Sequence, residues 1–120
     1  MGYMSSSGGD TVNSNSAAIM SDMDPESIEF EWDAVKARAN LEKHRVSFLT
    51  AAMTFRNEMV LRVDDREDYG EIRLIALGRV DLEVYRVIYS EPGEHRVRII
   101  SAQKASRDER EIYYSQILPE

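Results

Sequence analysis

The stretch IEFEWDAVKARANLEKHRVSF, residues 28–48, determines how the folded part of this chain begins. Its first five positions alternate apolar and acidic side chains, which is typical of a short half-buried strand. Asp33 follows as a helix N-cap, and the good helix formers after it predict a helix over residues 34–43. Ser47 is the expected cap of a second helix over residues 48–55. The stretch therefore predicts one strand followed by two helices.

Beyond this stretch the hydrophobic period changes from that of helices to that of strands. Four segments have strand-like composition: residues 59–63, 72–80, 82–90 and 96–101. Ser106 and Glu109 then match an S-x-x-E capping box, which predicts a terminal helix. The order is β-α-α-β-β-β-β-α, and short connections between consecutive strands imply an antiparallel sheet packed with helices. The expected fold class is α+β.

The first 27 residues differ in composition from the rest of the 120-residue chain. Ser, Gly, Asn and Asp dominate them, and no hydrophobic period is visible. Such a segment buries too little apolar surface to offset the entropy lost on ordering. We therefore expect a disordered tail over residues 1–27 and one folded domain over residues 28–117.

Composition limits the kinds of site that the chain can form. It has no cysteine and two histidines, His44 and His95, so disulfides and thiolate metal sites are excluded. We predict neither a metal nor a cofactor. No apolar run exceeds four residues, whereas a membrane span needs about 20. No secretory signal opens the chain, so we expect a cytoplasmic protein with no membrane segment.

The charge distribution bears on a nucleic-acid partner. A net charge of −7 argues against such a partner at first sight. However, all fifteen Lys and Arg residues lie at or after Lys36, and residues 96–110 hold five bases against two acids. The C-terminal part can therefore present a basic patch on an acidic molecule.

Three blocks of the sequence resemble the BrnT family. Residues 30–48, FEWDAVKARANLEKHRVSF, are similar to its opening signature FxWDxxKxxxNxxKHxVSF. Residues 84–89 followed by residues 96–102 resemble its VxYT…IRIISAR segment, and residues 105–113 resemble its AT-x-x-E-R-x-x-Y end. The resemblance covers about residues 28–114. Departures from the pattern are Arg45 in place of a frequent Gly and Gln103 in place of an Arg, and a common loop His is absent.

The resemblance implies a function and partners. BrnT proteins are toxins of type II toxin–antitoxin pairs, have a RelE-like fold and cleave RNA without a metal. Each is neutralised by an antitoxin with a ribbon-helix-helix DNA-binding domain, with a precedent of two toxins per two antitoxins. The complex represses its own operon, so operator DNA is a partner only through the antitoxin.

Metal-free RNA cleavage needs cations that stabilise charge on the phosphate oxygens. Arg98 is the first candidate, because burial of Val97 and Ile99 would leave it on the solvent face of the last strand. A solvated Arg98 paired with an acid is an equally open alternative. Arg73 and Arg79 project from one face of the strand predicted over residues 72–80, and they are second candidates for the same role. Surface ion pairing is the more frequent role for either.

Three further basic residues are candidates for RNA contact. Lys104 follows the last strand and could reach a phosphate, with a solvated loop lysine as the alternative. Arg96 projects from the same face as Arg98. His44 carries an imidazole that titrates near neutrality, although helix capping and packing are its more frequent role at a helix end.

Proton transfer needs a base for the 2′-hydroxyl and an acid for the leaving 5′-oxygen. Glu71, in the acidic stretch before a strand, and Tyr89 are the candidates. The alternative for Glu71 is a solvated loop carboxylate, and the alternative for Tyr89 is half-buried packing. Expected products are a 2′,3′-cyclic phosphate and a 5′-hydroxyl.

Two function classes compete on this sequence. The favoured one is an endoribonuclease toxin that inhibits translation and is held by an antitoxin. Its rival is a catalytically inactive BrnT-like protein that keeps only antitoxin binding and co-repression. The acidic balance and Gln103 favour the rival, whereas Arg98, Lys104 and Glu71 favour the enzyme. An independent DNA-binding module is disfavoured, because no helix has a dense basic face.

Overall fold

The computed structural model describes residues 18–20 and 25–118. Its strands are β1 (Ala18–Met20), β2 (Glu29–Glu31), β3 (Met59–Asp64), β4 (Arg73–Val80), β5 (Glu83–Gly93) and β6 (Arg96–Lys104). Its helices are α1 (Ala34–His44), α2 (Phe48–Met53) and α3 (Arg107–Ile117), with 3₁₀ turns η2 (Pro25–Ser27) and η3 (Thr54–Arg56). From β2 onward this is the predicted order, and the α+β class is confirmed. No helix among the described residues is long and apolar enough to cross a membrane.

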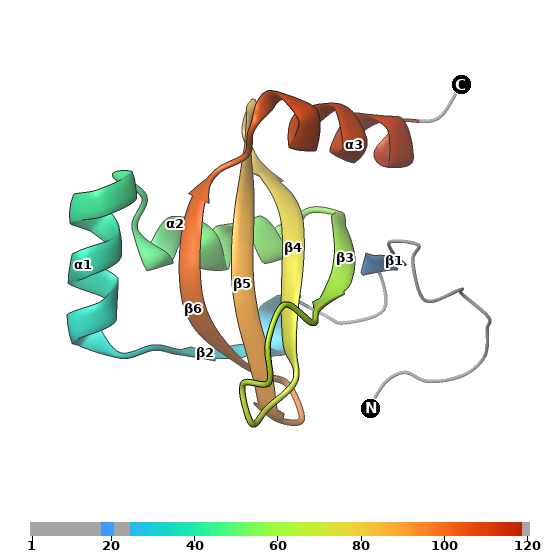
Figure 1. Ribbon diagram of the computed structural model, residues 1–120. Coiled ribbons are helices and arrows are strands. Elements are labelled where there is room, and N and C mark those ends of the chain that lie inside the picture. Colours follow the sequence, from blue (N-terminus) through green and yellow to red (C-terminus); the bar gives the residue numbers. More distant parts are fainter. Residues whose placement is uncertain (1–17, 21–24, 119–120) are drawn as a thin grey trace.

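The six strands form one sheet in the order β1-β3-β4-β5-β6-β2 (Figure 1). Strands β3 to β6 are antiparallel neighbours, as predicted. The predicted antiparallel sheet is confirmed for these four strands and differs at one edge, where β2 pairs in parallel with β6. Hairpin connections force antiparallel pairing, but β2 joins β6 across most of the chain and no hairpin sets its direction.

Ordered structure begins before the predicted domain start. Residues 18–20 form β1, which pairs with the first half of β3. Residues 25–27 form η2, and Glu26 lies 3.9 Å from Arg56 in an ion pair. These segments fall inside the predicted tail, whereas residues 1–17 and 21–24 lie outside the described residues. The structure thus gives secondary structure to residues 18–20 and 25–27, while the disordered tail over residues 1–27 and the domain over residues 28–117 stay predictions.

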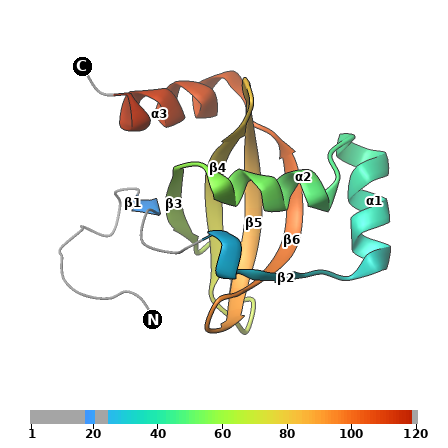
Figure 2. The ribbon, with the colours of Figure 1, turned by 180° about the vertical axis from the view of Figure 1, so that it is seen from behind.

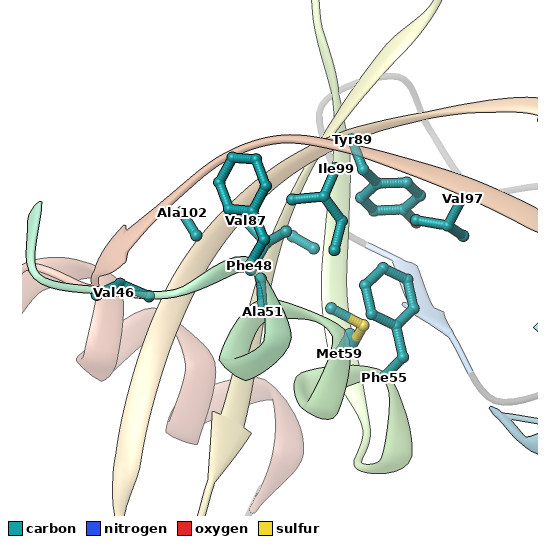
Figure 3. Close-up of a cluster of buried hydrophobic side chains, with 11 residues drawn as sticks. Val46, Phe48, Ala51, Phe55, Met59, Val87, Tyr89, Val97, Ile99 and Ala102 are labelled. Atoms are coloured by element: carbon teal, nitrogen blue, oxygen red, sulfur yellow. The ribbon is translucent and has the colours of Figure 1, made fainter. Parts of the chain in front are cut away.

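The main core lies between the sheet and the helices that follow β2. Helix α2 crosses one face of the sheet, and α1 flanks β6 (Figures 1 and 2). Phe55 packs edge-on against Phe30 and Tyr89, with ring centroids 5.2 and 5.0 Å apart. The other buried members of this cluster are apolar side chains of both layers (Figure 3): Val46, Phe48, Ala51, Met59, Ala76, Val87, Val97, Ile99 and Ala102.

A smaller core lies on the opposite face under α3. Helix α3 packs on one end of that face over Val60, Leu77 and Val84 (Figure 1). The Tyr113 hydroxyl donates to the Glu58 carbonyl at 2.9 Å and fixes the helix there. Helix α3 covers only that end, and no other helix among the described residues covers the rest of this face, which we call the open face.

Helix α1 has the predicted cap at its start. The Asp33 carboxylate accepts from the backbone N–H groups of Val35 and Lys36, as an N-cap should. Arg45 caps the end of the helix in a left-handed conformation with φ of 61°, and its backbone N–H donates to the Leu41 carbonyl. Glycine is the usual residue at such a position, because any β-carbon is strained there.

We expect Arg45→Gly to raise the free energy of unfolding by about 0.5–1 kcal/mol, since it removes that strain. Urea unfolding of wild type and variant measures the change. Arg45→Ala is the matched control, because it removes the guanidinium but keeps the β-carbon. An equal gain for both variants would contradict backbone strain as the cause.

Asn40 connects α1 to the part of the β6 edge that β2 does not pair with. Its side-chain amide donates to the carbonyls of Ala102 and Val46 at 2.8 and 3.0 Å, and it accepts from the Ala102 N–H at 3.2 Å. The side chain thus takes the place of a neighbouring strand beyond the short β2. This contact holds the first helix against the last strand.

Candidate functional site

A row of polar side chains crosses the open face of the sheet. Asp64 on β3, Arg73 on β4, Ser90 on β5, Arg98 on β6 and Glu31 on β2 are successive partners in the strand registers. Side chains of register partners project from the same face of a sheet. These five residues, which we call the polar row, therefore lie side by side beyond the edge of α3.

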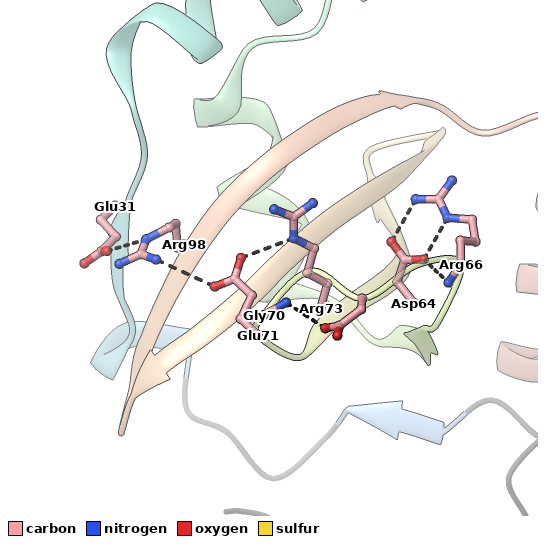
Figure 4. Close-up of polar contacts among 8 residues, drawn as sticks. Glu31, Asp64, Arg66, Gly70, Glu71, Arg73 and Arg98 are labelled. Carbon is pink, nitrogen blue, oxygen red and sulfur yellow. Dashed lines mark hydrogen bonds and ion pairs between the residues drawn. The ribbon is translucent and has the colours of Figure 1, made fainter.

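Glu71 connects the two arginines of the polar row. Its Oε2 lies 3.2 Å from Arg73 Nε and its Oε1 lies 3.8 Å from Arg98 Nη1 (Figure 4). The Arg98 side chain is 46% exposed and that of Arg73 is 23% exposed. Two guanidinium groups thus converge on one oxyanion at an accessible place on the sheet.

Irregular pairing between β5 and β6 shapes this part of the face. The register shifts between Ile88 and Tyr89, and again between Ser90 and Gly93. Because of the first shift, Ile99 and Ala102 both enter the main core. Strict alternation would have put Ile99 and Ala102 on opposite faces of the sheet. Arg98 points outward from the sheet, as predicted.

The outer ends of the row are carboxylates held by arginines. Glu31 accepts from Arg98 at 2.9 Å and from Arg96 at 2.8 Å, and these bonds hold the Glu31 pKa below its ordinary value. Asp64 accepts from both Nε and Nη2 of Arg66, at 2.7 and 2.8 Å. That pairing lowers the pKa of the buried Asp64 from 3.8 to about 2.

Asp64 makes stability depend on pH. Its folded pKa of about 2 lies below the ordinary 3.8, so its contribution is present above pH 4 and is lost as the pH falls toward 2. We expect Asp64→Asn to lower the free energy of unfolding at pH 7 by roughly 1–2 kcal/mol, since half-exposed Arg66 is screened by solvent. Unfolding at pH 7 and near pH 2 should show the difference shrinking. The matched control is Asp65→Asn, which changes an exposed neighbour; a pH-independent loss in Asp64→Asn would contradict the linkage.

The structure brings together four of the predicted site residues. Arg73 and Arg98 both contact Glu71, and Arg96 is linked to Arg98 through Glu31. Arg73 also stacks on the Tyr69 ring, with its Cζ 4.1 Å from the ring centroid. The ion pairing given above as the alternative role of Arg73 and Arg98 is therefore present, and both arginines pair with the same carboxylate, that of Glu71.

Two predicted residues lie apart from this spot. Tyr89 is fully buried in the main core on the opposite face, where burial raises its pKa above the ordinary value, so it cannot reach a substrate beside Arg98. Arg79 does share a face with Arg73, but it lies six residues along β4, about 20 Å away in an extended strand. There its guanidinium donates to the Asp81 carbonyl at 2.7 Å.

Lys104 and His44 are also outside the site. Lys104 ends β6 and pairs with Tyr85, on the face that α2 covers. His44 is the half-buried last residue of α1. This position agrees with the alternative role of helix capping and packing. Neither residue contacts the polar row in the described part of the chain.

Sequence reasoning missed Ser90 and Glu31. Ser90 is a polar residue directly after the apolar segment VIY, and that position was the available signal. Glu31 was used only as a polar position of the first strand, and its site role depends on pairing with a strand 67 residues later. Among the described residues, no group of three or more His, Cys, Asp or Glu could hold a metal ion.

The comparison with protein families decides what this fold is. A protein-family model, described as the ribonuclease toxin BrnT of type II toxin–antitoxin systems, matches residues 32–109. The chain belongs to the BrnT family. The match includes all of the polar row except Glu31, together with Glu71 and the Asn40 contact. As a toxin–antitoxin family, BrnT implies an antitoxin partner for this protein.

A solved structure agrees with the family. This BrnT protein resembles the ribonuclease toxin BrnT of Brucella abortus, with a TM-score of 0.52 and 26% sequence identity. The similarity covers 67% of this chain and 99% of that one. No curated protein matches. Family and fold class were therefore predicted correctly, while the RelE-like label stays a prediction.

Proposed function

We propose that this BrnT protein is an active, metal-independent endoribonuclease that cleaves RNA by attack of the 2′-hydroxyl and thereby inhibits translation in the cytoplasm. The observation that supports it most is the convergence of Arg73 and Arg98 on the Glu71 carboxylate. Guanidinium groups bind phosphate oxygens by the same parallel bonds that they make with carboxylates. A site that holds one anion in this way suits another.

The proposed reaction assigns a role to each central residue. Arg73 and Arg98 bind the scissile phosphate and stabilise charge that develops on its oxygens. Glu71 accepts the proton of the 2′-hydroxyl as that oxygen attacks phosphorus. The bond from phosphorus to the 5′-oxygen breaks, and solvent protonates the leaving oxygen. RNA then ends in a 2′,3′-cyclic phosphate and a 5′-hydroxyl, whereas DNA lacks the attacking group.

Regulation by an antitoxin completes the proposal. We infer a partner with a ribbon-helix-helix domain, assembled as two toxins with two antitoxins, which binds operator DNA and represses the operon. Support for this comes from the family resemblance. Coexpression with the neighbouring reading frame should restore growth, and operator binding should require both chains.

The test of activity uses purified protein and a short RNA. We expect cleavage that persists in EDTA, gives 2′,3′-cyclic phosphate ends, and is blocked by one 2′-deoxy nucleotide at the cleaved position. Growth arrest on expression without the antitoxin should accompany it. Intact RNA and normal growth would contradict the proposal.

The inactive co-repressor is the second candidate. It is favoured by one observation, namely that Glu31 and Glu71 already pair with the arginines of the site on a chain of net charge −7. This candidate predicts antitoxin binding and operator repression with no cleavage. The same assay with purified protein therefore separates the two functions.

A further inference from the structure

Ser90 differs from the other members of the polar row because its hydroxyl is buried and unpaired. The residue is 3% exposed, and its Oγ has no hydrogen-bond partner among the described residues. A buried polar atom without a partner is destabilising, so folded proteins contain few, and strained or binding positions are where they concentrate. The hydroxyl is therefore available to a ligand at a cost in stability.

The position of Ser90 relates this hydroxyl to the two arginines. Ser90 is the register partner of Arg73 on one side and of Arg98 on the other. Neighbouring strands lie about 4.8 Å apart, so the hydroxyl lies between two guanidinium stems roughly 10 Å apart. The Glu71 carboxylate contacts both guanidinium groups, so it lies over β5 near Ser90.

A phosphodiester suits these three donors better than Glu71 does. The two carboxylate oxygens of Glu71 each contact one arginine, and neither accepts a bond from Ser90. The phosphorus of a phosphodiester is tetrahedral, and each of its two non-bridging oxygens can accept more than one hydrogen bond. An oxygen that binds one guanidinium can therefore also accept from the Ser90 hydroxyl. One phosphodiester can thus satisfy all three donors at once.

We propose that Ser90 binds the scissile RNA phosphodiester as a third donor beside Arg73 and Arg98, and that the phosphate displaces Glu71 from both arginines. This inference rests on the proposed ribonuclease function and adds a substrate-binding residue to it. Displacement also fits the proposed role of Glu71, because a carboxylate released from two guanidinium groups can accept a proton from the adjacent 2′-hydroxyl.

The test compares Ser90→Ala with wild type and with Ser101→Ala. Ser101 is a partly buried serine of β6 that pairs with Ile88, outside the polar row, and gives a matched control. Binding of a 2′-O-methyl RNA oligonucleotide, which cannot react by 2′-hydroxyl attack, is measured by fluorescence anisotropy at fixed salt. Thermal unfolding is recorded for each protein.

We expect Ser90→Ala to weaken oligonucleotide binding about tenfold, as loss of one hydrogen bond to a charged group should. Its melting temperature should rise by a few degrees, because the variant removes an unpaired buried hydroxyl. Ser101→Ala should bind as wild type does. Such a gain in stability with a loss of affinity is the opposite of what a structural serine would show.

Several outcomes would overturn the inference. Wild-type affinity in Ser90→Ala would remove Ser90 from the phosphate site, and a fall in both affinity and melting temperature would make it structural. Failure of the wild type to bind the oligonucleotide would also overturn it. By contrast, Ser90-dependent binding without any RNA cleavage would retain the phosphate site and contradict only the ribonuclease proposal.

Discussion

Arg98→Ala is expected to lower the rate of RNA cleavage by about 10²–10³-fold, the usual effect of losing one donor that stabilises transition-state charge. The fold should remain, because each carboxylate that loses Arg98 keeps another arginine. Glu31 still accepts from Arg96 at 2.8 Å, and Glu71 still lies 3.2 Å from Arg73. Single-turnover cleavage of a short RNA and the urea midpoint of the same sample measure both properties.

Two variants control this experiment. Arg107→Ala removes an arginine of α3 whose side chain is 84% exposed and should leave cleavage unchanged. Arg98→Lys keeps the positive charge without the paired donors of a guanidinium, so an intermediate rate is expected. Unchanged cleavage in Arg98→Ala, with wild-type stability, would remove Arg98 from the site.

Asn40→Ala is expected to lower the free energy of unfolding by roughly 3 kcal/mol, a large fraction of a small domain's stability. The variant leaves the N–H and carbonyl of buried Ala102 and the carbonyl of Val46 without the bonds that Asn40 supplies. Unpaired backbone groups in such a place retain their full desolvation cost. Urea unfolding followed by circular dichroism measures the loss.

Glu42→Ala is the matched control on the same helix, at an exposed position, and should change stability by no more than about 0.5 kcal/mol. Asn40→Asp gives a second comparison. It keeps the shape and one acceptor but replaces the amide donor with an oxygen that faces two carbonyls. A loss below about 1 kcal/mol in both Asn40 variants would contradict the bridge to β6 as a main support of the domain.

Local signals in the sequence predicted the elements well. Asp33, Ser47 and the Ser106–Glu109 capping box mark helix starts through bonds within three residues, and each is present as expected. Alternation likewise placed Arg98 outward, because buried Val97 and Ile99 set the direction of β6. Each of these features depends on neighbours in the chain, which a sequence displays directly.

The features that the sequence hid depend on pairing across the chain. The parallel partner of β2 and the strand-like role of Asn40 both involve β6, more than 60 residues later. Tyr89 and Ser90 are adjacent, and the choice between them turns on which face of β5 meets the helices. Only the register with Arg73 and Arg98 shows that Ser90 belongs to the site.

The parallel pairing of β2 with β6 also determines when the site can exist during synthesis. Residues of the polar row come from positions 31, 64, 73, 90 and 98, so a nascent chain that has not released β6 from the ribosome has none of the Arg98 contacts. At about 5–20 residues per second, growth from β2 to β6 takes several seconds. The proposed site therefore cannot assemble until β6 has been made, and we expect chains that lack β6 not to cleave RNA.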